Sequence, residues 1–229
     1  MPGIYTAAAP LRAGAAGPGE SVPITVADPD GTVRGGIVVL YSSAKHTEPQ
    51  LDLLLALAED GWIALAPNLF HRSDDQKDSL FVDFDGCFDW LIQRGVFADC
   101  IGVLGFDAAG TAAFLVATDR PIGAAVSVAT PGIVTPLYAG STPPLVAAAA
   151  NLRAPWLGLY GEDDPNTPPG HIAQLEDAVA RAEVATNIVT YPGLRHRADQ
   201  DPGEPDDEIV SARTDAQTRI FDWFDSNLR

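Results

Sequence analysis

The sequence predicts an α/β fold with a mostly parallel β-sheet that is covered by helices on both faces. Short apolar segments alternate with segments of about 10–15 residues that have helical spacing, and this alternation is typical of β-α-β units. The chain of 229 residues is long enough for one domain with a packed core. Its composition, 46% hydrophobic and 20% charged, excludes a largely disordered protein.

The elements follow in chain order. Residues 1–20 are rich in Ala, Gly and Pro without periodicity and predict a loosely ordered lead-in. Residues 21–31 alternate apolar and polar positions and end in a turn, as in an edge strand, whereas the later apolar runs are continuous, as in buried parallel strands. These later strands are expected at 35–43, 62–67, 101–104, 123–129, 155–161 and 187–193. The helices are expected at 48–60, 78–94, 108–118, 170–182 and 211–227.

Charge and composition narrow the class of partner. The net charge is −17 and the lysines are Lys45 and Lys77, so the electrostatic field repels nucleic acid and anionic membranes. The N-terminus MPGIYTAAAP lacks the features of a leader, and no stretch reaches the roughly 18 apolar residues of a membrane span. We expect a cytoplasmic protein, monomer or homodimer, that acts on a small-molecule substrate without a cofactor. Cys87 and Cys100 predict apolar packing residues, and no spacing indicates a metal site.

The segment GFDAAG (105–110) joins an expected strand to an expected helix. Its spacing is typical of a nucleophile elbow, a sharp turn that raises its middle residue, Asp107, above the sheet and requires small residues two positions away on each side. Gly105 and Ala109 satisfy that requirement, and the helix N-terminus favours negative charge at Asp107. Taken alone, the segment is equally compatible with Asp107 as an ordinary helix N-cap.

Two further residues follow in the order nucleophile, acid, base that hydrolases with such an elbow use. Asp164 follows the strand expected at 155–161, with Asp163 as the alternative, and His196 follows the last strand. Each has an ordinary structural explanation, as part of an acidic turn before proline or as a surface histidine. Because the carboxyl ends of parallel strands share one edge of the sheet, we expect Asp107, Asp164 and His196 to form one site.

On these residues the chain resembles the dienelactone hydrolase family, a branch of the α/β-hydrolase superfamily without a large cap domain. The resemblance spans residues 22–228 and implies a single α/β-hydrolase domain at 21–229 after the lead-in. The motifs that carry it are GIVVLYSS, GWIALAPNLFHR, GVLGFDAAG, APWLGLYGEDDP and YPGLRH.

The resemblance also implies roles for other residues. The oxyanion hole would use the amide of Ala108 and an amide near Ser42 or Ser43. Arg72, at the end of APNLFHR, matches a family arginine that helps to hold an anionic substrate.

The chain departs from the family pattern at three places. The family carries Cys at the elbow, and its relatives often Ser, where this chain has Asp107. The family's acidic residue after the first buried strand is replaced by Ser42, and the Gly-Phe that usually follows the histidine is replaced by Arg197 and Ala198. Dienelactone is therefore not the expected substrate.

An aspartate at the elbow favours a different reaction from ester cleavage. A carboxylate that attacks an ester gives a mixed anhydride and must expel a much more basic alkoxide. Attack on an epoxide or carbon–halogen bond instead gives an alkyl ester on Asp107, which water activated by His196 cleaves. Epoxide hydrolases and haloalkane dehalogenases resemble the chain at this position, and Tyr138 or Tyr41 could protonate a leaving oxygen.

Two alternatives remain open at this point. The chain could be a catalytically degenerate family member that binds a small ligand or a protein partner. Asp107 could also act as a general base in an isomerase or lyase, without a covalent intermediate.

Overall fold

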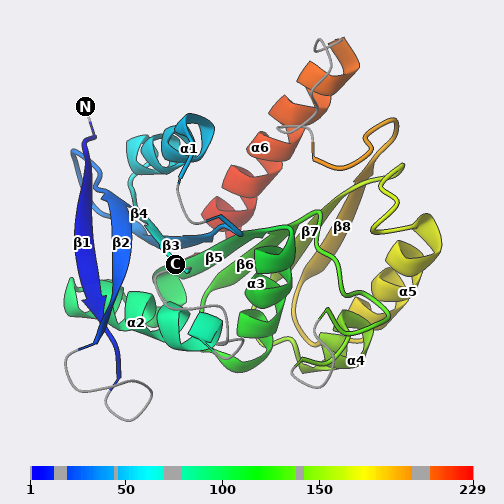
Figure 1. Cartoon of the computed structure of the whole chain (residues 1–229), viewed down its shortest axis with the longest axis horizontal. Helices are drawn as coiled ribbons and strands as arrows, with labels where there is room; N and C mark the ends of the chain where they lie inside the picture. Colours follow the sequence, from blue (N-terminus) through cyan, green and yellow to red (C-terminus); the bar gives the residue numbers. More distant parts are fainter. Residues whose placement is uncertain are drawn as a thin grey trace.

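A single eight-stranded sheet forms the centre of the molecule (Figure 1). The computed structural model describes residues 2–12, 20–43, 46–69, 79–137, 142–197 and 207–228. The strands are β1 (Ile4–Pro10), β2 (Ser21–Ala27), β3 (Gly35–Leu40), β4 (Trp62–Pro67), β5 (Ile101–Phe106), β6 (Ala124–Val128), β7 (Trp156–Gly161) and β8 (Thr186–Tyr191). Their order across the sheet is β1-β2-β4-β3-β5-β6-β7-β8. All neighbours from β4 to β8 in this order run parallel, and β2 pairs antiparallel with β1 and β4, which confirms the mostly parallel sheet.

Helices cover both faces of the sheet, as the alternating pattern predicts. They are α1 (Glu48–Glu59), α2 (Ser79–Gln93), α3 (Ala108–Asp119), α4 (Leu145–Ala148), α5 (Pro169–Val179) and α6 (Asp207–Asn227). Helices α1 and α6 lie on one face, and α2, α3, α4 and α5 lie on the other (Figure 1). Each face has its own cluster of buried apolar side chains, so the chain folds as three layers.

Helix α3 is the most deeply buried helix, and it follows β5 directly. Every residue from Ala109 to Ala117 is buried, because the sheet lies on one side of this helix and α2 and α4 pack against it. A helix that is apolar on all sides is expected in such a place. Since α3 begins at Ala108, its packing fixes the turn that holds Asp107.

Two expectations for the N-terminal region were wrong. Residues 4–10 form β1 rather than part of a loosely ordered lead-in, and β1 covers β2, which is therefore not an edge strand. Strand β1 buries fully only Ala9, so the pattern of its side chains carries no signal of a strand. Its order comes from backbone pairing with β2, from Ile4 opposite Ala27 to Pro10 opposite Ser21.

A buried chain of hydrogen bonds ties three elements together beneath the elbow. The indole Nε1–H of Trp156 in β7 donates to Ser127 Oγ in β6 at 3.0 Å. The hydroxyl of Ser127 in turn donates to the carbonyl oxygen of Gly110, in the first turn of α3, at 2.9 Å. Trp156 and Ser127 are fully buried, so both polar groups depend on these contacts.

Replacing this hydroxyl tests how much it supports the fold. Ser127→Ala leaves the indole N–H of Trp156 without this acceptor, and we expect the free energy of unfolding to fall by about 1–3 kcal/mol. Urea unfolding measures the change. The control is Thr218→Ala, which removes an exposed hydroxyl that donates to Thr214 within α6. The control should stay within about 0.5 kcal/mol of wild type, and an equal stability of all three proteins would contradict the prediction.

Candidate active site

Asp107 lies in the turn between β5 and α3 with the backbone angles expected of an elbow. Its φ is 55° and its ψ is −129°, a conformation that residues other than glycine rarely adopt. Asp107 is at the N-cap position of α3, but its side chain makes no capping hydrogen bond. The carboxylate instead makes its contacts away from the helix, which argues against the N-cap interpretation.

The elbow is as tight as the small-residue spacing predicts. A Cβ atom at Gly105 would lie 2.4 Å from the carbonyl oxygen of Ala109 and 2.8 Å from the Cβ of Ala113, which no side chain tolerates. A Cβ at Gly110 would lie 2.1 Å from Thr130 Oγ1. The sharp reversal of the chain at Asp107 therefore depends on glycine at both positions.

Ser42 supports the elbow through its side chain. Its Oγ accepts a hydrogen bond from the backbone N–H of Ala109 at 3.1 Å, which links the end of β3 to the start of α3. The preceding amide, that of Ala108, is at the first position of the helix, where N–H groups have no partner within the helix. The hydroxyl oxygen of Ser43 is buried and has no hydrogen-bond partner among the described residues. The sequence pattern gave Ser42 a role through a backbone amide and missed this side-chain contact.

The turn after β7 and the loop after β8 are held against each other. The backbone N–H of Asp163 donates to the carbonyl oxygen of Leu194 at 3.0 Å. A Cβ at Gly161, the last residue of β7, would lie 2.5 Å from that same oxygen and 2.7 Å from the carbonyl oxygen of His196. Glycine at this position lets the loop that carries His196 approach the end of β7 closely.

These supports bring the three predicted residues into one hydrogen-bonded row. His196 Nε2 lies 2.7 Å from Asp107 Oδ1, and His196 Nδ1 lies 2.6 Å from Asp164 Oδ2. The side chain of Asp164 is completely buried, and its other oxygen accepts the backbone N–H of Asn166 at 2.8 Å. Asp163 is exposed, so Asp164 rather than Asp163 is the partner of the imidazole.

Arg197 is a fourth member of the site that the sequence reasoning missed. Its Nη1 donates to Asp107 Oδ2 at 2.7 Å, so Asp107 contacts two consecutive residues of the loop after β8. The Arg197 side chain is only 4% exposed, and its guanidinium lies over the ring of Phe106 at 4.4 Å from the centroid. The one signal in the sequence was the departure from the family pattern after the histidine. A charged residue at that place says nothing about where its side chain points.

The contacts set the charge states of Asp107 and His196. Burial raises the pKa of the Asp107 carboxyl, but the hydrogen bond from His196 and the positive charge of Arg197 outweigh it and lower this pKa below its ordinary value. The hydrogen bond to Asp107 raises the pKa of His196 to about 9 against a smaller opposing effect of burial, and Asp164 adds to the rise. At neutral pH the site therefore holds an ionised Asp107 and a protonated His196.

The remaining predicted residues lie apart from this row or outside the described residues. The hydroxyl of Tyr41 is 3.4 Å from the carbonyl oxygen of Gln50, and the ring is buried and stacked on Phe106 at 5.3 Å between centroids. The ring of Tyr41 thus packs beside the site through Phe106. Arg72 and Tyr138 lie outside the described residues.

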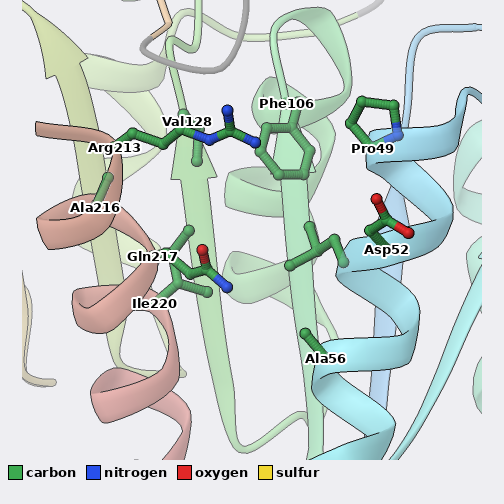
Figure 2. Close-up of a pocket in the computed structure, with 10 residues that line it drawn as sticks. Pro49, Asp52, Ala56, Phe106, Val128, Arg213, Ala216, Gln217 and Ile220 are labelled. Atoms are coloured by element: carbon green, nitrogen blue, oxygen red, sulfur yellow. The ribbon is translucent and has the colours of Figure 1, made fainter. Parts of the chain in front are cut away.

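A cleft opens between α1 and α6, beside the ends of β5 and β6 (Figure 2). Its volume is about 350 Å³. The residues that line it are Pro49, Asp52, Leu53 and Ala56 of α1, Phe106 of β5, Val128 of β6, and Arg213, Ala216, Gln217 and Ile220 of α6. Most of this lining is apolar, and Arg213 extends from α6 in the direction of Phe106. Phe106 joins the cleft to the site, because it precedes Asp107 and contacts Arg197.

Metal ligands do not gather in the described part of the chain, where no group of three or more His, Cys, Asp or Glu residues is placed to hold a metal ion. His46 contacts Thr25 Oγ1 at 3.1 Å, and burial lowers the pKa of its imidazole.

Within the described ranges, no helix is both long and apolar enough to cross a lipid bilayer.

Neutralising Asp107 should shift the titration of His196. Because the bond to Asp107 is the largest cause of the raised pKa, Asp107→Asn should lower the His196 pKa from about 9 by at least about one unit, toward the ordinary value near 6.5. An NMR titration of the imidazole measures the shift. Asp163→Asn is the matched control, since it removes an exposed carboxylate from the same turn as Asp164 and should leave the pKa unchanged. A His196 that titrates near 6.5 in wild type would disprove the ion pair.

Comparison with known proteins agrees with this architecture. The profile of the dienelactone hydrolase family matches residues 79–228. A Yersinia pestis protein named "Putative carboxymethylenebutenolidase" is 30% identical over 233 residues, which cover 90% of this chain and 84% of that protein. An Escherichia coli protein of the same name is 28% identical over 228 residues, which cover 90% and 83%.

Solved structures of similar proteins have the same fold. The crystal structure of a "Putative Dienelactone Hydrolase" from Klebsiella pneumoniae superposes with a TM-score of 0.78 at 26% identity and covers 97% of this chain and 98% of its own. A dienelactone hydrolase from Anabaena variabilis, at 20% identity, superposes with a TM-score of 0.71 over 100% and 99% and supports the fold alone. In the described residues this fold carries no cap domain. The chain therefore belongs to the dienelactone hydrolase family and is a hydrolase with the α/β-hydrolase fold.

Proposed function

We propose that this hydrolase opens an epoxide or a carbon–halogen bond in a small molecule through an alkyl ester on Asp107. The observation that carries the proposal is the position of the Asp107 carboxylate, at the elbow and 2.7 Å from the Nε2 of an imidazole that Asp164 orients. The same arrangement with Cys or Ser at the elbow would suit acyl transfer. A carboxylate there suits attack on saturated carbon, because an alkyl ester is a stable intermediate and a mixed anhydride is not.

In the first step, Oδ1 of the ionised Asp107 forms a bond to the electrophilic carbon. The electron pair of the breaking bond leaves with the halide or stays on the epoxide oxygen. That oxygen needs a proton, and the protonated His196 holds one at Nε2, next to the reacting carboxylate. Donation of this proton to the epoxide oxygen leaves His196 neutral, which is the form that the second step requires. When a halide leaves instead, the imidazolium releases its proton to solvent once the charge of Asp107 is gone.

In the second step, neutral His196 takes a proton from water, and the water oxygen adds to Cγ of the Asp107 ester. Collapse of the tetrahedral centre expels the alkoxide, which receives the proton back from His196 and leaves as the alcohol. The second proton of the water remains on the Asp107 carboxyl group and passes to His196, which restores the ion pair. Asp164 holds the imidazole in the orientation that presents Nε2. Esterification removes the negative charge that raises the His196 pKa, so the imidazole becomes a base only after the alkyl ester has formed.

The cleft between α1 and α6 supplies space for the apolar part of the substrate. Its volume, about 350 Å³, suits a small organic molecule, and most of its lining is apolar. Phe106 lines the cleft and immediately precedes Asp107 in the chain, and it is the residue through which a ligand in the cleft would approach the elbow. Arg213 has no ion-pair partner among the described residues and would favour a substrate with an anionic end.

One observation favours a second candidate function, ligand binding without turnover. Both oxygens of Asp107 are engaged, by His196 and by Arg197, and an ion-paired carboxylate is a weaker nucleophile than a free one. A degenerate family member would keep this ion pair closed and use the cleft alone. The labelling experiment below separates the two candidates, because only the hydrolase transfers oxygen from water to its own carboxylate.

Heavy-oxygen labelling tests the covalent step. In a single turnover in H₂¹⁸O, with excess enzyme and a panel of epoxides, haloalkanes and haloacids, Asp107 should gain one heavy oxygen, detected by mass spectrometry of the peptide that contains it. His196→Gln should form the alkyl ester but lose at least about 10²-fold in its hydrolysis, because the water has no base. Asp107→Asn should form no ester.

The outcomes of this experiment distinguish the covalent hydrolase from the alternative functions. Turnover without label in Asp107 would show a general-base mechanism and reject the proposal. Binding of panel compounds without turnover, measured by calorimetry, would favour the degenerate binder. Asp163→Asn serves as the matched control and should label as wild type does.

Filling the cleft tests where the substrate lies. Ala216→Phe places a large side chain in the lining, so KM for a bulky epoxide such as styrene oxide should rise at least about tenfold, while epoxyethane should be affected less. Thr218→Phe, which adds the same bulk at an exposed position of α6 outside the lining, is the control. Equal effects of the two variants on both substrates would place the substrate elsewhere.

A further inference from the structure

We propose that Arg197 is a catalytic residue that stabilises the negative charge on Asp107 Oδ2 when water adds to the alkyl ester. This inference rests on the proposed function and assigns a role to a residue that the family pattern does not contain. The contact that carries it is direct, since Arg197 Nη1 lies 2.7 Å from Asp107 Oδ2. The other oxygen, Oδ1, faces His196 Nε2, so the two oxygens of the carboxylate have different partners.

The different partners give the two oxygens of the Asp107 carboxylate different roles in the reaction. Oδ1 lies on the side of the imidazole, where both the proton donor and the later base are located, and becomes the ester oxygen. Oδ2 then becomes the ester carbonyl oxygen, and it is already held by the guanidinium. When the water oxygen bonds to Cγ, the electron pair of the carbonyl bond moves to Oδ2. When the bond to Oδ1 breaks, the pair returns to the carbonyl. No oxidant or further reactant is needed.

An aspartate nucleophile changes which carbonyl oxygen gains negative charge. With Cys or Ser at the elbow, the carbonyl that gains negative charge belongs to the substrate. With Asp107 it belongs to the enzyme's own side chain, so the stabilising donor must reach the carboxylate itself. Arg197 does so from the position next to the base in the chain. Donors that are fixed in place before the charge develops are the most effective stabilisers of such an intermediate.

The surroundings of Arg197 keep its guanidinium in position. The side chain is 4% exposed, and its guanidinium lies 4.4 Å from the centroid of Phe106, which is itself buried and stacked on Tyr41. Little solvent reaches the guanidinium itself, so it is less screened than an arginine at the surface would be. A buried arginine held on an aromatic ring has few alternative positions.

The test separates the two chemical steps in Arg197→Met, which keeps the length and apolar contact of the side chain but removes its charge. The probe is styrene oxide, and rapid quench with mass spectrometry follows the ester on Asp107. We expect ester formation to change by less than about fivefold and ester hydrolysis to fall by about 10²–10³-fold, so that the ester accumulates. Arg197→Lys, with a charge but no planar fork, should recover part of the hydrolysis rate.

The controls distinguish this role from a structural one. Arg195→Met removes an exposed arginine two residues away and should leave both steps unchanged. Thermal unfolding of each variant detects loss of the fold. Ester hydrolysis at the wild-type rate in Arg197→Met would overturn the inference while the proposed function stands, and so would a parallel fall of both steps with a lower Tm. A wild-type enzyme that forms neither ester nor diol refutes the proposed function itself, and the inference falls with it.

Discussion

The positive φ of Asp107 is the constraint on which the site depends. A residue with a Cβ rarely adopts φ 55°, and it keeps this conformation where the surrounding structure imposes it. Here β5, α3 and the close packing at two glycines impose it. The turn lifts the carboxylate off the helix end, where it would otherwise serve as a cap. Buried support beneath it, from Ser127 and Trp156, holds the first turn of α3 against β6 and β7.

The site brings two carboxylates together with an imidazole and a guanidinium. Two carboxylates, Asp107 and Asp164, face one imidazole, and Arg197 adds a second positive charge on the far oxygen of Asp107. In a chain with a net charge of −17, this balance keeps Asp107 ionised although it is partly buried. It also makes the protonation of His196 depend on whether Asp107 carries its charge, which couples the two proposed chemical steps.

Membership of the dienelactone hydrolase family explains the scaffold but not the choice of residues at the site. Asp at the elbow, Ser42 after β3 and Arg197 after the histidine replace different residues of the family pattern, and both Ser42 and Arg197 contact the elbow. Ser42 anchors the start of α3, and Arg197 holds the oxygen of Asp107 that does not face the base.

The sequence by itself determined the order of the parallel strands and helices, because continuous apolar runs and helical spacing leave few other ways to bury the chain. It also predicted Asp107, His196 and an aspartate after β7 as site residues, since each follows a strand whose carboxyl end lies at the same edge of the sheet. Tertiary structure alone decided β1, which backbone pairing orders without a side-chain pattern. It also decided the choice of Asp164 over Asp163 and the contact of Arg197 with Asp107, because side-chain direction in a loop depends on packing between elements distant in the sequence.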